Sequence, residues 1–182
     1  MTRIVIIAAM SLRLLTADVR QCACDPTKPE TMRSRECGLC NEADQHAGEG
    51  DVFFLKDINP RKQNRWLALP RAHGAGGHPL HQLPPALQTK LWTEAIAKAK
   101  EVWGPEAWGI AYNSERQRTQ CHGHVHIGKL LLGLAPGRYV DVSGPAAIRL
   151  PKDGSGVWIH PLPGGRLRVH FGEGITETVL LR

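Results

Sequence analysis

The clearest periodic pattern in the chain predicts a helix over residues 85–104. Apolar side chains recur there three and four positions apart, which is the spacing of one helix face: they are Leu87, Leu91, Trp92, Ala95, Ile96, Ala99, Val102 and Trp103. The segment is rich in residues that favour helix, and Gly104 followed by Pro105 ends it. We therefore expect one long helix packed on the remaining elements.

Shorter apolar runs bounded by turn residues predict strands. The runs over 51–60 and 64–70 predict a hairpin, and further strands are expected over 107–113 and 120–133. Short strands between Gly- and Pro-containing turns follow in residues 136–182. The order strand, strand, helix, strand, strand is typical of an α+β fold with an antiparallel sheet.

The first 50 residues differ in composition from the rest of the chain. Residues 1–20 carry an early Arg3 and an apolar stretch interrupted by Arg13, a pattern that favours a signal peptide or N-terminal anchor over a mature strand or a misassigned start. Residues 21–50 form a polar segment that holds four of the five cysteines. These features predict an exported, periplasmic or membrane-associated protein, in which disulfides can form.

Length and charge limit the classes of partner. A chain of 182 residues favours one main globular domain, so we expect a core over 51–135 and a β extension over 136–182. The net charge of +6 favours anionic partners such as nucleotides and phospholipid headgroups. The cationic residues are scattered and aromatics are few, so we expect no dedicated nucleic-acid binding.

A row of histidines is the main chemical signal. Three of them alternate with single residues, namely His122, His124 and His126. A strand over 120–133 would place the three rings on one face, roughly 6.5–7 Å apart, and bury Val125 and Ile127 on the other. Imidazole is nucleophilic and titrates near neutral pH, so this row suits chemistry on a phosphate. A merely solvated strand face is the alternative, and the nearby Arg116 and Arg118 argue against it.

The stretch His122-Gly-His124-Val-His126-Ile resembles the signature of the histidine triad (HIT) superfamily. Its members are nucleotidyl hydrolases and transferases that act at the α-phosphate of nucleotides. The resemblance covers about residues 50–130 and implies a HIT-like antiparallel sheet with a packed helix. It also implies that His124 is the nucleophile, that His126 contacts the phosphate, and that His122 supports His124 or binds metal.

Further site residues follow from the same resemblance. Thr119 would lie near the leaving group, Asn113 would hold the sugar or phosphate, and Asp57 would bind ribose hydroxyls. The chain departs from the usual pattern at Gly123, where an apolar side chain is common. Another departure is the Arg-Thr-Gln run before the triad, where the common nucleotide hydrolases carry a Gly-Gln pair.

That run is similar to a motif of the bacterial CDP-diacylglycerol pyrophosphatase group, together with Asn113-Ser114. The similarity implies cleavage of CDP-diacylglycerol to CMP and phosphatidate, with Arg118 and Gln120 binding the substrate. Arginine suits this role because its guanidinium forks to phosphate oxygens. The partners expected are a nucleotide or nucleotide-lipid, a membrane surface and a second copy of the chain as a homodimer.

The cysteines leave two readings open. Cys37 and Cys40 form a C-x-x-C pair, and one branch of the superfamily implies a structural zinc held by this pair with His73 and His122. The competing reading is a disulfide, for example between Cys24 and Cys37 or Cys40, with Cys22 and Cys24 pairing with each other or with the later two. Cys121 is expected to be a buried thiol.

The chemistry itself requires no cofactor under this hypothesis, and the zinc would be structural. The expected activity is hydrolysis of a nucleotide pyrophosphate through a nucleotidyl-histidine. Two alternatives share the same residues: a nucleotidyl transferase that passes the intermediate to another acceptor, and a non-catalytic module that binds nucleotide or zinc.

Overall fold

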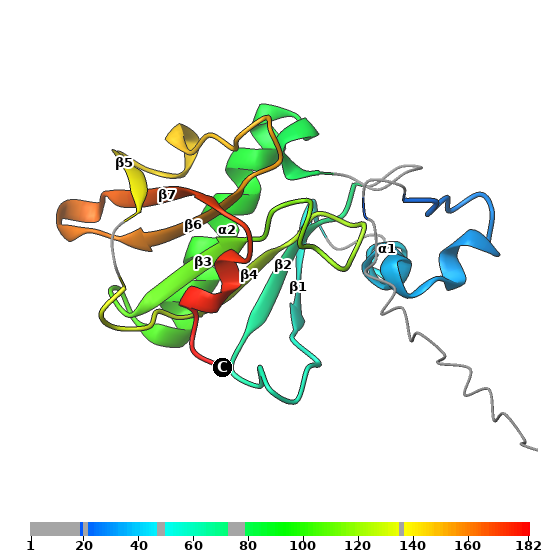
Figure 1. The fold of residues 1–182 in the computed structure, drawn as a ribbon, viewed down its shortest axis with the longest axis horizontal. Helices are drawn as coiled ribbons and strands as arrows, with labels where there is room; N and C mark the ends of the chain where they lie inside the picture. The colour runs from blue at the N-terminus through cyan, green and yellow to red at the C-terminus, as the bar shows by residue number, and fades with distance from the viewer. Residues whose placement is uncertain (1–18, 20–21, 47–49, 73–78, 135–136) are drawn as a thin grey trace, which may run out of the picture.

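The apolar runs assemble into one seven-stranded antiparallel sheet in a computed structural model of the protein, which describes residues 19, 22–46, 50–72, 79–134 and 137–182 (Figure 1). The spatial order is β1-β2-β4-β3-β6-β7-β5. The strands are β1 (Val52–Lys56), β2 (Trp66–Pro70), β3 (Trp108–Tyr112), β4 (Val125–Lys129), β5 (Arg138–Val142), β6 (Gly156–Pro161) and β7 (Leu167–Glu173). The predicted α+β class with an antiparallel sheet is therefore confirmed.

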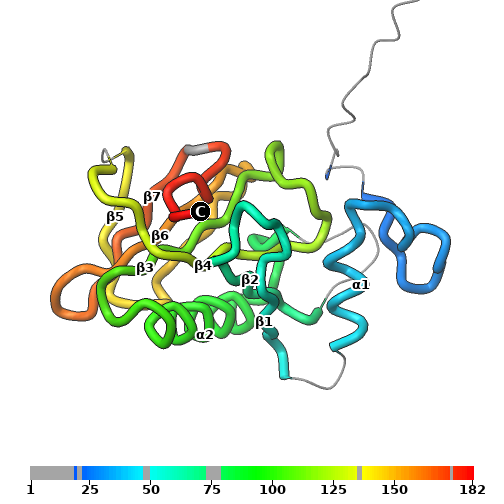
Figure 2. Tube along the Cα trace, turned by 90° about the horizontal axis from the view of Figure 1, so that it is seen from below, coloured from blue at the N-terminus to red at the C-terminus, as the bar shows by residue number. Residues whose placement is uncertain are grey.

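The periodic helix is confirmed as α2 (Pro85–Trp103), which has 19 residues. It begins with a proline at its first position, where a missing N–H costs nothing, and it ends at Gly104, whose φ of 75° few other residues adopt. Its apolar face, including Leu91 and Trp92, is buried against Ile110 and Ile127 of the sheet. Figure 2 shows α2 lying along one side of the strands.

The opposite side of the sheet is covered by two separate segments. Helix α1 (Gly38–Gln45) packs its Ala43 against Phe53 and Leu69 of the β1–β2 hairpin. The C-terminal 3₁₀ turn η7 (Thr176–Val179) packs over the middle strands, and Val179 and Leu180 contact Ala111 and Trp158. In Figure 2 this C-terminal turn and α2 lie on opposite sides of the strands.

The C-terminal residues extend the same sheet. β6 pairs with β3, and β7 joins β6 to β5. The segment predicted as a β extension therefore adds strands directly beside the predicted core and shares its apolar interior, where Ile159 and Val169 are fully buried. The predicted signal or anchor over 1–20 lies outside the described residues apart from Val19, and no helix among the described residues is both long and apolar enough to cross a membrane.

The strand predicted over 120–133 is wrong in its extent. β4 covers only Val125–Lys129, so His122 and His124 come before the strand and only His126 belongs to it. A long-range attachment accounts for the difference: Cys121 is bonded to Cys22, and its backbone N–H donates to the carbonyl of Glu36. These contacts attach the chain around Cys121 to the N-terminal segment instead of to a neighbouring strand.

The packing of α2 on the sheet predicts a large stability difference between two leucines. Leu91 is 1% exposed in the core, whereas Leu132 is 98% exposed. Leu91→Ala is expected to lower the free energy of unfolding by about 2–5 kcal/mol, because it removes buried methyl groups and leaves a cavity. Leu132→Ala should change it by less than about 0.5 kcal/mol. Urea unfolding of both variants checks this, and similar losses would contradict the assigned core.

Candidate active site

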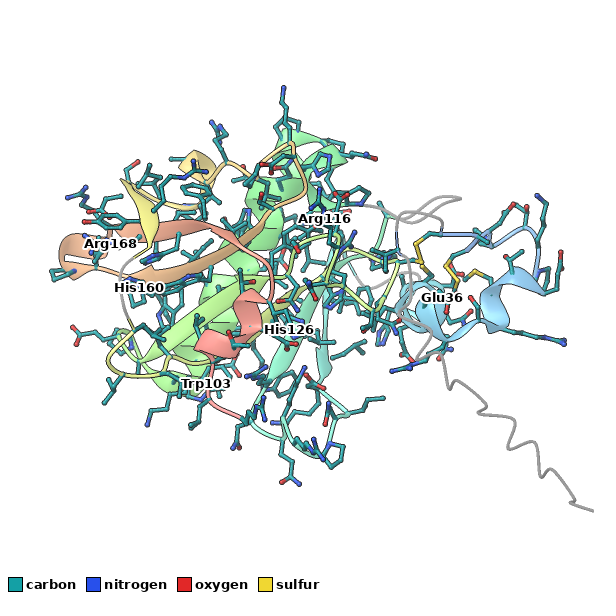
Figure 3. All side chains as sticks on the ribbon, in the orientation of Figure 1. Glu36, Trp103, Arg116, His126, His160 and Arg168 are labelled. Atoms are coloured by element: carbon teal, nitrogen blue, oxygen red, sulfur yellow. A yellow bond between two sulfur atoms is a disulfide. The ribbon has the colours of Figure 1, made fainter. Side chains whose placement is uncertain are left out.

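His126 is placed by the alternation of β4. Its neighbours Val125 and Ile127 point into the core under α2, so the imidazole must project from the opposite face of the sheet. There it lies across from Leu67 on β2 and Ala111 on β3. The ring is 6% exposed, and Figure 3 labels it beside the C-terminal turn.

His124 lies next to His126, with 4.9 Å between the ring centroids and an edge-on angle of 71°. Its Nδ1 is 2.9 Å from the backbone oxygen of His122. A carbonyl can only accept, so Nδ1 carries the hydrogen and donates it, which leaves the lone pair of the neutral ring on Nε2. Sequence reasoning expected the rings side by side, and the structure brings these two together although His124 precedes the strand.

His122 is held elsewhere. Its ring is fully buried, and Nε2 is 2.6 Å from the backbone oxygen of Pro70 at the end of β2. Its contribution to the pair is the carbonyl that orients His124. The expected supporting role of His122 thus has a specific geometry, through its main chain.

A carboxylate from the C-terminal turn completes the group. Glu177 Oε2 lies 3.4 Å from Nδ1 of His126, 2.6 Å from Nζ of Lys62 and 2.9 Å from Nη1 of Arg65. Arg65 is 1% exposed and also donates to the backbone oxygens of Leu180 and Leu181. The loop between β1 and β2 is therefore fastened to the C-terminal turn directly beside the histidines.

Asn113 is tied to the same turn. It is 6% exposed, and its Oδ1 accepts from the backbone N–H of Glu177 at 3.0 Å and from the hydroxyl of Thr176 at 3.3 Å. The carbonyl end of this amide is therefore engaged by the protein. Its amide nitrogen is the end that can donate to a ligand.

Burial controls the protonation of both histidine rings. Desolvation lowers the pKa of His124 to about 3, helped by the nearby His126 and Arg118. Desolvation also lowers the pKa of His126 to about 4, and there the carboxylate of Glu177 opposes the change. Both rings are therefore neutral at neutral pH, which is the form that a nucleophilic imidazole requires.

The remaining predicted substrate residues fall into two groups. Arg118 is 4% exposed, lies over the ring of Tyr112 at 5.5 Å, and keeps its buried Nε without a hydrogen-bond partner among the described residues. Thr119 is exposed in the loop before the triad. Gln120 donates to the backbone oxygen of Arg35 and accepts from the N–H of Leu39, so both ends of its amide bind the N-terminal segment.

Asp57 has a local role in its own turn. Its Oδ1 accepts from the backbone N–H of Asn59 at 3.0 Å, and its charge also acts on the guanidinium of Arg65. Asp57 is therefore connected to the Glu177 group through Arg65 and does not contact the histidines through any described hydrogen bond.

The cysteines form two adjacent disulfides. Cys24 is bonded to Cys37, a pairing among those expected, and Cys22 is bonded to Cys121. The expectation that Cys121 is a thiol is therefore wrong, and Cys40 is the one free, buried cysteine. Such bonds are typical of oxidising environments outside the bacterial cytosol.

The predicted zinc ligands do not fit a metal in this arrangement. Cys37 has no thiolate to offer because its sulfur is bonded to Cys24, and the proposed ligand His73 lies outside the described residues. The sulfurs of Cys24, Cys37 and Cys121 do lie within 4.8 Å of one another, a spacing that free thiolates could use for a metal. In this structure all three sulfurs belong to disulfides, so none of them is a thiolate that could bind a metal.

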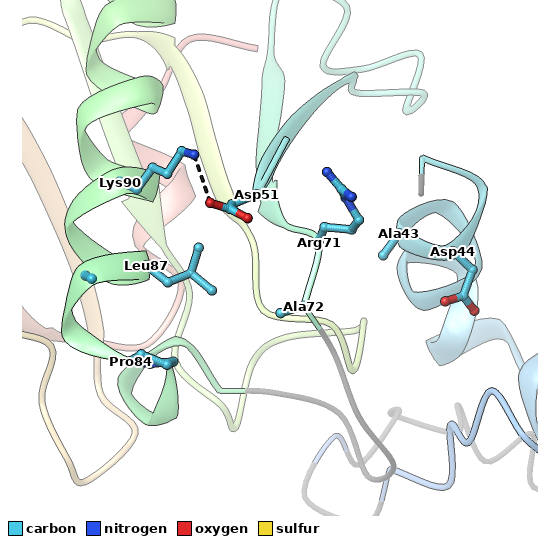
Figure 4. A pocket seen from close by; sticks show the side chains of 9 residues that line it. Ala43, Asp44, Asp51, Arg71, Ala72, Pro84, Leu87 and Lys90 are labelled. Carbon is cyan, nitrogen blue, oxygen red and sulfur yellow. Dashed lines mark hydrogen bonds and ion pairs between the residues drawn. The ribbon is translucent and has the colours of Figure 1, made fainter. Parts of the chain in front are cut away.

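A cleft of about 590 Å³ lies apart from the histidines, between α1 and the first turns of α2 (Figure 4). Lys90 and Asp51, which form an ion pair of 2.8 Å, line it together with Arg71 and Leu87. None of the triad histidines lines this cleft. It supplies no group to the proposed chemistry.

Three residues beside the triad escaped the sequence reasoning: Lys62, Arg65 and Glu177. The first two fall in a polar turn, and Glu177 follows Asn113 by 64 residues. No spacing or motif connects these positions, because folding alone brings them together. A charged residue shortly before the apolar residues 179–181 is the only local signal, and it is a weak one.

The disulfide arrangement predicts a definite pattern of alkylation. The native protein should take up no label, because Cys40 is buried and the other four cysteines are bonded. Denaturant without reductant should expose one reactive thiol, and denaturant with reductant should expose all five cysteines. Intact mass measurement counts the labels, and peptide mapping locates them. Labelling of Cys37 or Cys121 without reductant would contradict the pairing.

The low pKa of His124 predicts that stability depends on pH. In the unfolded chain this ring gains a proton near pH 6.5, whereas the folded ring stays neutral until about pH 3. The unfolded state therefore binds more protons as pH falls below 6.5, and stability is lost at up to about 1.4 kcal/mol per pH unit for this ring. His124→Asn should make the slope between pH 6.5 and 5 shallower by about this amount in urea titrations. Above pH 7.5 the two slopes should coincide, and equal slopes below pH 6 would contradict the burial of a neutral ring.

No family model matches the chain, and no curated protein matches it either. The histidine pair and the groups around it are therefore the features that bear on function.

Proposed function

We propose that the protein is a hydrolase of the histidine-triad type that cleaves a nucleotide-containing pyrophosphate. The observation that carries this proposal is the arrangement of His124, whose Nδ1–H is committed to the carbonyl of His122 while its ring stands 4.9 Å from His126. This arrangement directs the free lone pair to Nε2, which is the atom that would attack phosphorus.

The proposed reaction has two steps. In the first, Nε2 of His124 forms a bond to the α-phosphorus, and the bond from that phosphorus to the bridging oxygen breaks. With the anionic substrate bound, His126 is protonated and gives this proton to the leaving phosphate, so that a nucleotidyl group remains on His124. In the second step a water molecule attacks the same phosphorus and passes a proton to the now neutral His126. The P–N bond breaks, which releases the nucleoside monophosphate and restores the ring of His124.

Several groups near the rings suit an anionic substrate. The buried Nε of Arg118 lacks a partner among the described residues, and its charge acts on His124. The amide nitrogen of Asn113 can donate to a phosphoryl oxygen, since Oδ1 is the end that is bonded to the C-terminal turn. A positive guanidinium and an amide donor beside a nucleophile would stabilise the charge that develops on phosphorus.

The finer proposal is that the substrate is CDP-diacylglycerol, cleaved to CMP and phosphatidate in the bacterial periplasm. It rests on the Asn-Ser and Arg-Thr-Gln motifs before the triad and on the net positive charge. The two disulfides support an oxidising compartment.

His124→Ala is expected to lower kcat by more than about 100-fold, because it removes the nucleophile. The measurement is release of monophosphate from a panel of CDP-diacylglycerol, CDP-alcohols and dinucleoside diphosphates. Rapid acid-free quenching of the wild type, followed by peptide mass analysis, should show a nucleotidyl group on His124.

His46→Asn is the matched control, since this histidine lies at the end of α1 and stacks on Phe53. It should retain wild-type turnover. Full activity of His124→Ala on every substrate would overturn the proposal. Product formation that requires an acceptor other than water would identify a transferase.

A further inference from the structure

The two neighbouring rings have different groups at Nδ1. Nδ1 of His124 lies 2.9 Å from a neutral backbone carbonyl, and this hydrogen bond leaves Nε2 as the nitrogen that can react. Nδ1 of His126 lies 3.4 Å from the carboxylate of Glu177, which is an ion-pair distance and not a hydrogen bond. The two rings therefore differ mainly in the charge beside them.

That difference decides which ring gains a proton when an anion arrives. A carboxylate stabilises an imidazolium far more than a carbonyl does, because it contributes a full opposite charge in a buried place. Glu177 is the main group that raises the pKa of His126 against the effect of burial. The pKa of His124 is lowered by desolvation, His126 and Arg118, and Glu177 opposes this only as the smallest contribution. A bound anionic substrate therefore raises the pKa of His126 further, so that His126 takes a proton from solvent and His124 stays the free nucleophile.

Charged groups from three parts of the chain surround His126. Lys62 and Arg65, from the loop between β1 and β2, share the carboxylate of Glu177 and oppose protonation of His126. His124 precedes β4, and Arg118 acts on that ring. Glu177 is the anionic group of this set, and it alone favours a positive charge on His126.

The position of residue 177 does not depend on its own carboxylate. Its backbone N–H donates to Asn113, and Arg65 donates to the backbone oxygens of Leu180 and Leu181. The C-terminal turn is also attached to the strand β4 through the bond from Leu181 N–H to the oxygen of Lys129. A neutral side chain at 177 can therefore be introduced while the turn keeps its main-chain bonds.

We propose that Glu177 is a positioning residue whose carboxylate, 3.4 Å from Nδ1 of His126, makes His126, instead of His124, the ring that carries a proton to the substrate. The inference rests on the proposed hydrolase reaction and adds a division of labour to it. In the step that breaks the bridging P–O bond, the proton on Nε2 of His126 passes to the leaving oxygen. In the hydrolysis step the neutral His126 takes a proton from the attacking water, which prepares the ring for the next turnover.

The first test is an NMR titration that needs no turnover. Ring carbons of histidine-labelled protein are followed between about pH 2 and 8, alone and with inorganic pyrophosphate as the anionic probe, so that a midpoint below that of the wild type stays within the range. In Glu177→Gln the midpoint of His126 is expected to fall by about 1 pH unit or more, because an opposite charge is lost. Glu177→Asp should restore most of the shift, and Lys62→Ala should move the midpoint upward.

The second test is the pH dependence of kcat. In the wild type the basic limb reports the protonated His126 of the enzyme–substrate complex. Glu177→Gln should move that limb to lower pH by a similar amount and reduce kcat at pH 7.5 by about 10-fold or more. Lys129→Gln, on the exposed end of β4, is the matched control and should leave the profile unchanged.

The outcomes separate the two proposals. If Glu177→Gln loses stability but the midpoint of His126 stays in place, Glu177 has a purely structural role and the inference is overturned. If the midpoint falls but the wild type hydrolyses no nucleotide pyrophosphate of the panel, the effect of Glu177 on His126 is supported and the proposed function fails. A kcat profile unchanged in Glu177→Gln would refute the proton-carrying role of His126.

Discussion

The burial of Val125 and Ile127 beneath α2 is the constraint on which the candidate site depends. Side chains of a strand alternate, so a core residue on each side of His126 leaves its ring no direction except the far face of the sheet. The free energy gained by burying those two β-branched side chains thus holds a polar ring in place. On that face the C-terminal turn closes over the ring, which lowers the local dielectric and keeps the imidazole neutral.

The same strand explains why the histidines act as a pair instead of a row. A regular strand would have spaced successive rings evenly, but the chain leaves the sheet before Val125. His122 then turns its ring to Pro70 and offers its carbonyl to His124. A main-chain acceptor fixes a tautomer without introducing charge, which is suitable for a nucleophile. The carboxylate of Glu177, 3.4 Å from the next ring, adds an opposite charge, which is suitable for an acid.

Local sequence patterns predicted the helix, the first hairpin and the face on which His126 lies. These features depend on residues near one another in the chain, and the hydrophobic periodicity of 85–104 and the alternation at 125–127 contain the necessary information. The course of 120–124 depends on a bond between Cys22 and Cys121, which are 99 residues apart. The approach of Glu177 to His126 depends likewise on the complete sheet. Contacts of this kind have no local signal, so the sequence could not place them.

The buried thiol of Cys40 has a consequence for the durability of the disulfides next to it. Exchange between a thiol and a disulfide proceeds through the thiolate. Burial raises the pKa of Cys40 to about 11, so only about one molecule in ten thousand carries that thiolate at pH 7. An unpaired cysteine packed among four bonded ones would ordinarily invite scrambling. Here burial keeps the thiol of Cys40 protonated and therefore unreactive. The Cys22–Cys121 disulfide beside His122 then persists although Cys40 has no sixth cysteine to pair with.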